Sequence, residues 1–136
     1  TLLRAHGIDP AGRRVTVVGR SLVIGRPAAL LLTRADATVT LCHRKTPDLA
    51  ARCRAADILL AAAGAPGLIT PECVRPGQIV LDAGATALPD GTLRGDVTPA
   101  AAAIAACTPV PGGIGSVTTA LLLRHTVQAA EKSHHF

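Results

Sequence analysis

Three short blocks contain the residues whose types and spacing could support chemistry. The first, Gly19-Arg20-Ser21 followed by Gly25, comes directly after the β-branched run at 15–18. A buried strand that enters a glycine turn and then a helix is a place where phosphate groups meet helix-terminal N–H groups. Ser21 stands where the pattern G-x-G-x-x-G has its second glycine, so an ordinary strand-to-helix turn is an equally good interpretation.

The second block, His43-Arg44-Lys45, follows a predicted strand at 38–42. A domain that binds NAD usually has an acidic residue here, about 20 residues after the glycine turn, which bonds the ribose 2′-hydroxyl. Guanidinium and ammonium groups suit a 2′-phosphate instead, so the block favours NADP over NAD, and Arg20 is placed to reach the same phosphate. A solvated basic loop is the alternative.

The third block is the run Thr-Pro-Val-Pro-Gly-Gly-Ile-Gly at 108–115. Its prolines and glycines predict a rigid loop whose backbone can approach a ligand closely. The loop leads into a predicted helix that carries Ser116 and Thr118 near its start. A plain connector is the alternative.

Other reactive side chains do not have the spacing of a metal site, and we expect none. His134 and His135 are adjacent near a terminus, and we expect the dispersed cysteines to be free thiols in a reducing cytosol. Asp82 and Asp96 could be taken for a carboxylate pair, but we expect them to stabilise turns. The cysteines are Cys42, Cys53, Cys73 and Cys107.

The elements that must position these blocks alternate between strands and helices. We expect strands at 15–18, 38–42, 57–62 and 78–82, and helices at 2–6, 25–34, 47–55, 98–106 and 116–132. A small hairpin is predicted between Ala87 and Leu93, around Pro89-Asp90-Gly91. This alternation predicts an α/β fold of the Rossmann type, a doubly wound parallel sheet in a single domain.

Composition agrees with that fold and excludes several classes. The 136 residues are 49% hydrophobic but include no Trp, Tyr or Met, so the core must consist of Ala, Val, Leu and Ile. The net charge of +5 comes from scattered basic residues without aromatic neighbours, which argues against nucleic-acid binding. We see neither a signal peptide nor an apolar run of about 18 residues, so we expect a cytoplasmic protein that does not span a membrane.

Six blocks in the same order resemble the methylenetetrahydrofolate dehydrogenase/methenyltetrahydrofolate cyclohydrolase family. They lie at 19–27, 43–44, 63–67, 82–84, 95–97 and 108–115. The resemblance implies that NADP is the cofactor, that Arg44 joins Arg20 near its 2′-phosphate, and that the other matching residues line its site. The full set of implied cofactor-binding residues is Gly19, Arg20, Ser21, Gly25, His43, Arg44, Ala85, Gly115 and Thr118.

The same resemblance implies a fragment of a two-domain protein. Residues 1–12 would be the end of an interdomain helix and its loop, 13–132 the NAD(P)-binding domain and 133–136 a tail. The family's folate-side catalysis uses a Tyr and a Lys four residues apart on the preceding domain, and this chain has no Tyr. We therefore expect no catalytic residue in this chain, a tetrahydrofolate substrate bound through the other domain, a homodimer, and an inactive isolated chain.

Two departures from the family pattern keep other interpretations open. The chain has Gly-Ser-Val-Thr at 115–118 where the family usually has Gly-Pro-Met-Thr, and Asp-Ala-Gly-Ala-Thr at 82–86 where it usually has Asp-Val-Gly-Ile-Asn. A nucleotide-binding or regulatory module that has lost catalysis is one alternative. Another two-domain NADP dehydrogenase, acting on shikimate or an amino acid, is the second.

Overall fold

Five parallel strands form the central sheet of the computed structural model, which describes residues 1–133. Their order across the sheet is β2-β1-β3-β4-β7, so the chain passes outward from β1 to β2 and then returns to the other side of β1. This order confirms the predicted doubly wound parallel sheet. The strands are β1 (Arg14–Val18), β2 (Thr38–Cys42), β3 (Ile58–Ala61), β4 (Ile79–Asp82) and β7 (Ala106–Cys107).

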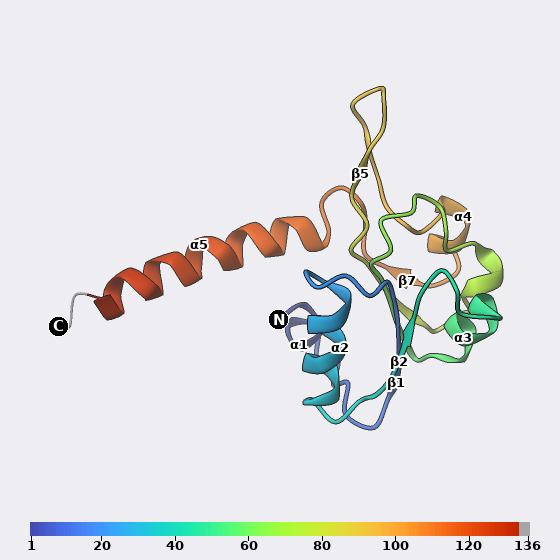
Figure 1. Ribbon diagram of the computed structural model, residues 1–136, viewed down its shortest axis with the longest axis horizontal. Helices are drawn as coiled ribbons and strands as arrows, with labels where there is room; N and C mark the ends of the chain where they lie inside the picture. Colours follow the sequence, from blue (N-terminus) through green and yellow to red (C-terminus); the bar gives the residue numbers. More distant parts are fainter. Residues whose placement is uncertain (134–136) are drawn as a thin grey trace.

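Helices cover both faces of this sheet, as Figure 1 shows. Helices α1 (Leu2–Ala5) and α2 (Gly25–Thr33) pack on one face, against a core that includes Val15, Val17 and Leu60. The other face is covered by α3 (Leu49–Ala55), the 3₁₀ turn η1 (Pro71–Cys73) and α4 (Pro99–Ala102). Successive residues of a strand point to opposite faces, so the continuous apolar run of β3 fills both cores.

The prediction of a helix at 98–106 is wrong for the second half of that segment. Helix α4 ends at Ala102, and residues 106–107 form β7 instead. Alanine favours a helix, but here backbone pairing with β4 outweighs that preference, since Ala106 N–H donates to the Gln78 carbonyl and Thr108 N–H to that of Val80. The start of the helix is as predicted, and Thr98 caps it, because Thr98 Oγ1 accepts a hydrogen bond from Ala101 N–H.

Smaller differences affect the other boundaries. Helix α3 begins at Leu49 rather than at residue 47, because Asp48 has a left-handed conformation with φ of 51° that a helix cannot contain. The predicted hairpin is confirmed as β5 (Thr86–Ala87) paired with β6 (Leu93–Arg94), and it projects from the sheet in Figure 1.

The last helix, α5 (Ile114–Ser133), begins two residues before its predicted start and extends away from the rest of the chain (Figure 1). None of its residues is buried, and the Leu122 side chain is 65% exposed. Leu3 of α1 is partly buried and packs against the core on the α2 side of the sheet. Apart from Ser133, the predicted tail lies outside the described residues, as do His134 and His135.

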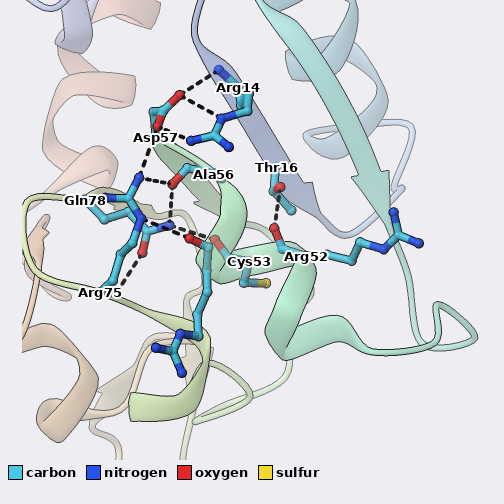
Figure 2. A network of polar contacts seen from close by, with 9 residues as sticks. Arg14, Thr16, Arg52, Cys53, Ala56, Asp57, Arg75 and Gln78 are labelled. Atoms are coloured by element: carbon cyan, nitrogen blue, oxygen red, sulfur yellow. Dashed lines mark hydrogen bonds and ion pairs between the residues drawn. The ribbon is translucent and has the colours of Figure 1, made fainter.

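Charged side chains join the strands at the amino end of the sheet (Figure 2). Asp57 Oδ1 accepts hydrogen bonds from Arg14 at 2.9 Å and from Arg75 at 3.0 Å. The bonds from Arg14 lower the pKa of Asp57 to about 2. Gln78, which is fully buried, donates to the carbonyls of Cys53 and Ala56. These groups connect β1, α3 and the turn before β4 at the edge opposite the glycine turn.

All four cysteines are free thiols, and Cys42, Cys53 and Cys73 are buried. Within residues 1–133, no helix combines the length and the apolar character needed to cross a membrane. The same residues contain no cluster of three or more His, Cys, Asp or Glu side chains that could hold a metal ion.

Candidate functional site

The turn between β1 and α2 depends on two glycines that touch. Gly19 follows the last residue of β1, as predicted, with a φ of +113°, and a Cβ there would overlap the Ala62 carbonyl oxygen. A Cβ on Gly25 would overlap the Gly19 carbonyl oxygen. Any larger residue at either position would therefore force β1, α2 and the end of β3 apart.

Ser21 has a local structural role that the sequence did not reveal. Its Oγ accepts hydrogen bonds from Ile24 N–H at 3.1 Å and from Gly25 N–H at 3.3 Å. These donors lie at the N-terminus of α2, where a Rossmann domain commonly offers N–H groups to a phosphate. The hydroxyl thus satisfies two of the groups at the helix start, while the side chain itself remains exposed.

A basic turn follows β2 at the neighbouring position on the same edge. Arg44 and Lys45 are exposed and His43 is half-buried, and Arg20 is exposed after β1. The ion pairs among residues 1–133 involve only Arg14 and Arg75 with Asp57, so neither Arg20 nor Arg44 is neutralised by a carboxylate. These side chains form a cationic area beside the glycine turn, suited to an anionic group.

Helix α3 adds a further charge near this turn. Burial raises the pKa of the Cys42 thiol at the end of β2, whereas Arg52 and a hydrogen bond with Thr46 act in the opposite direction. The Arg52 side chain extends from α3 toward the end of β2 in Figure 2. Arg52 was not predicted from the sequence, because only folding brings α3 to the end of β2. Thr46 lies just after β2 in the sequence but was not part of the predicted basic block.

A groove of about 740 Å³ opens at the other end of this edge. One wall comes from α2 and the loop before it, including Val23 and Ile24, and the other from the start of α5. Of the predicted site residues, Ala85, Gly115 and Thr118 line the groove. Its volume lies within the range of about 300–1,000 Å³ that is common for small-molecule sites.

Two buried aspartates hold the loops that follow β3 and β4. Asp96 is fully buried and accepts N–H groups of Ala63, Gly64 and Ala65, in the loop after β3. Asp82 accepts N–H groups of Gly84, Val97 and of Asp96 itself. The prediction that these carboxylates stabilise turns is confirmed, although the sequence did not show which loops they hold.

The structure thus brings the predicted residues to one edge of the sheet, in three groups. His43 and Arg44 follow β2, the residues from Gly19 to Gly25 follow β1, and Ala85 follows β4. Three strand spacings separate the ends of β2 and β4, about 14 Å in total. The groove includes Ala85 but not Gly19, His43 or Arg44, so an extended ligand lying across the strand ends is needed to contact all three groups.

Comparison with known proteins gives this geometry its context. Residues 1–134 match the family model described as the NAD(P)-binding domain of tetrahydrofolate dehydrogenase/cyclohydrolase. The chain belongs to this family.

Two curated members named bifunctional protein FolD illustrate the relationship. The FolD 1 protein of Rhodococcus jostii is 60% identical over 131 residues, which cover 95% of this chain and 44% of the relative. The FolD protein of Chloroflexus aurantiacus is 56% identical over 130 residues, covering 94% of this chain and 46% of the relative. The chain therefore spans about half the length of the curated relatives it matches.

Solved FolD structures have the same fold. The bifunctional FolD enzyme of Campylobacter jejuni superposes with a TM-score of 0.92 at 41% identity, over 97% of this chain and 48% of that one. The FolD structure from Trypanosoma brucei, a complex with NADP and an inhibitor, gives a TM-score of 0.90 at 43% identity, over 99% and 49%. The family match does not support a shikimate or amino-acid dehydrogenase, and no comparison supports a purely regulatory module.

Proposed function

We propose that this chain is the NADP-binding part of a methylenetetrahydrofolate dehydrogenase/cyclohydrolase of one-carbon metabolism. In this proposal it binds NADP across the carboxyl edge of the sheet and presents the nicotinamide to a folate bound through a second domain. The relatives that carry the FolD name are about twice as long as the matched region, which supports a second domain. We propose that 13–132 form the cofactor domain, with 1–12 as its connection and 133–136 as a tail.

The basic turn after β2 is the observation on which the choice of NADP depends. Residues 43–47 contain no Asp or Glu that could accept a hydrogen bond from a ribose 2′-hydroxyl. Arg44 and Arg20 are exposed after the adjacent ends of β2 and β1, and residues 1–133 give neither a carboxylate partner, so they are available to a 2′-phosphate. The NADP in the Trypanosoma brucei relative supports this assignment.

The groups along the edge also fit the rest of a dinucleotide. The glycine turn, with Gly19, Ser21 and Gly25, lies at the centre of the edge, where the two halves of such a cofactor meet at a topological switch point. The groove beside Ala85, Gly115 and Thr118 has open space next to Gly115. We assign the 2′-phosphate to His43 and Arg44 with Arg20, and the nicotinamide to this groove.

Within this proposal, the chain supplies orientation rather than acid–base groups. When bound, NADP supplies the hydride acceptor, and the groove holds the nicotinamide ring against a rigid wall while excluding water from one of its faces. Asp82 fixes the loop after β4, which also lines the groove, by accepting a hydrogen bond from Gly84 N–H. The chain contains no Tyr, so the family's Tyr and Lys pair must come from elsewhere in the protein.

An assay of methylenetetrahydrofolate-dependent NADPH formation tests the function. The full-length protein should be active and should prefer NADP to NAD, whereas the isolated chain should bind NADP weakly and remain inactive. The isolated chain is the matched control, because it has the same cofactor residues without the second domain. Activity of the isolated chain would show that catalytic residues lie within it, and a full-length protein that binds no NADP would refute the proposal.

We also propose a cytoplasmic homodimer. Unpaired cysteines are typical of a reducing compartment, and the unburied apolar residues of α5 give the chain surfaces that can associate. Light scattering after size exclusion should give twice the monomer mass for the full-length protein. A monomer at micromolar concentration would contradict the dimer without affecting the proposed cofactor.

A further inference from the structure

The basic turn after β2 is closed by several hydrogen bonds at once. Thr46 N–H donates to the His43 carbonyl at 2.8 Å, so residues 43–46 form a hydrogen-bonded four-residue turn. Arg44 and Lys45 occupy its two central positions, and both are exposed. The side chains with the potential to contact an anion are therefore displayed at the tip of a tight turn instead of along a loose loop.

The Thr46 hydroxyl connects both ends of this turn. Its Oγ1 accepts His43 N–H at 2.9 Å, and it lies 3.3 Å from His43 Nδ1. Lys45 N–H donates to the same Nδ1 at 3.2 Å. Because Nδ1 accepts from a backbone N–H, the neutral ring carries its proton on Nε2, and the Thr46 hydroxyl is able to donate to Nδ1.

We propose that Thr46 is a positioning residue that holds Arg44 toward the 2′-phosphate of the cofactor and so determines the preference for NADP over NAD. The inference rests on the proposed function. Thr46 is half-buried behind the tip of the turn, so it acts through Arg44. A turn that is already ordered does not have to be ordered on binding, and this preorganisation improves affinity.

The effect should be specific to one cofactor because NAD has no 2′-phosphate. Loss of the hydroxyl loosens the turn. Only a ligand whose 2′-phosphate contacts Arg44 should then bind with lower affinity. A purely structural role of Thr46 would instead weaken NADP and NAD together, because the end of β2 lies next to the glycine turn. The ratio of the NADP and NAD affinities therefore distinguishes a positioning role of Thr46 from a general effect on stability.

Thr46→Val removes the hydroxyl with little change of shape, and Thr46→Ser keeps it. Thr40→Val makes the same chemical change on an exposed position of β2. Dissociation constants of the full-length protein are measured for NADP, NAD, adenosine 2′,5′-bisphosphate and AMP. We expect Thr46→Val to weaken NADP and the bisphosphate about five- to tenfold, with NAD and AMP within about twofold and both other variants near wild type.

Equal losses for NADP and NAD in Thr46→Val, or no loss for either, would overturn the inference. If the variant does not fold, Thr46→Ala carries the same expectation, since alanine lacks the hydroxyl and fits the space of threonine. A wild-type protein that binds neither NADP nor the bisphosphate would refute the proposed function and this inference with it. A wild type that prefers NADP, with an unchanged preference in Thr46→Val, would refute the positioning role alone.

Discussion

Asp96→Asn is the substitution that most directly tests how the cofactor edge is built. Asp96 Oδ2 accepts Ala63 N–H at 2.6 Å and Gly64 N–H at 3.1 Å, and Oδ1 accepts Ala65 N–H at 2.8 Å. A carboxylate only accepts hydrogen bonds, which matches these donors. Asparagine replaces one oxygen by an NH₂ group that only donates. In either orientation of the amide, at least one backbone N–H loses its acceptor and faces another donor.

The expected cost follows from this arrangement. A lost hydrogen bond to a charged group, with its donor left inside the protein, costs about 1.5–3 kcal/mol, and the bonds that remain weaken because the acceptor is no longer charged. We expect a total loss of about 2–4 kcal/mol from a free energy of unfolding that is typically about 5–15 kcal/mol. Urea unfolding followed by circular dichroism measures this loss. Cofactor affinity should fall as well, because the loop after β3 adjoins the glycine turn.

Asp36→Asn is the matched control for charge. The Asp36 side chain is exposed, and its φ of 59° is a conformation that asparagine tolerates. Its stability should stay within about 0.5 kcal/mol of wild type. A loss of less than about 1 kcal/mol in Asp96→Asn would refute the reasoning, because it would mean that the three N–H groups find other partners.

Three further substitutions test separate parts of the structure. Arg44→Ala should weaken NADP by about 1.5–3 kcal/mol and leave NAD almost unchanged in binding titrations, and equal losses would count against a 2′-phosphate contact. Gly115→Ala should raise stability by up to about 1 kcal/mol, since a Cβ there has open space in a helix, yet lower NADP affinity. Unchanged affinity would place the cofactor elsewhere. Asp57→Asn tests pH dependence: the pKa of Asp57 is lowered to about 2, so its ionised form stabilises the fold above about pH 4, and this contribution disappears as pH falls through about 2. The variant should therefore lose less stability than wild type between about pH 5 and pH 2 in thermal unfolding, and parallel profiles would contradict the role of the ion pairs.

The strands were predictable because their signal is local. The run at 15–18 and those of β2, β3 and β4 are rich in branched aliphatic residues and are bounded by glycine or polar residues. Strand β7 was not predictable from its own composition. Ala106 and Cys107 follow an alanine-rich segment, and they become a strand only because β4 offers an unpaired edge.

The proposed cofactor residues also divide into those that the sequence made recognisable and those that it did not. The glycine turn and the basic block were recognisable because positive φ and cationic charge require particular residue types at particular places. The roles of Thr46 and Asp96 were not recognisable. Asp96 acts on Ala63, which lies more than 30 residues away and comes within reach only when the chain has folded. Thr46 bonds to His43 only three residues before it, but its residue type alone does not reveal that bond.

The sequence by itself therefore determined the fold class, the family and the order of the ligand-contacting blocks. Strand alternation, glycine turns and basic residues are properties of neighbouring positions, and six such blocks in order are specific. Only the tertiary structure decided that these blocks share one edge and that buried carboxylates shape the loops after β3 and β4. Those outcomes depend on which buried donors need acceptors, and burial is a property of the folded chain as a whole.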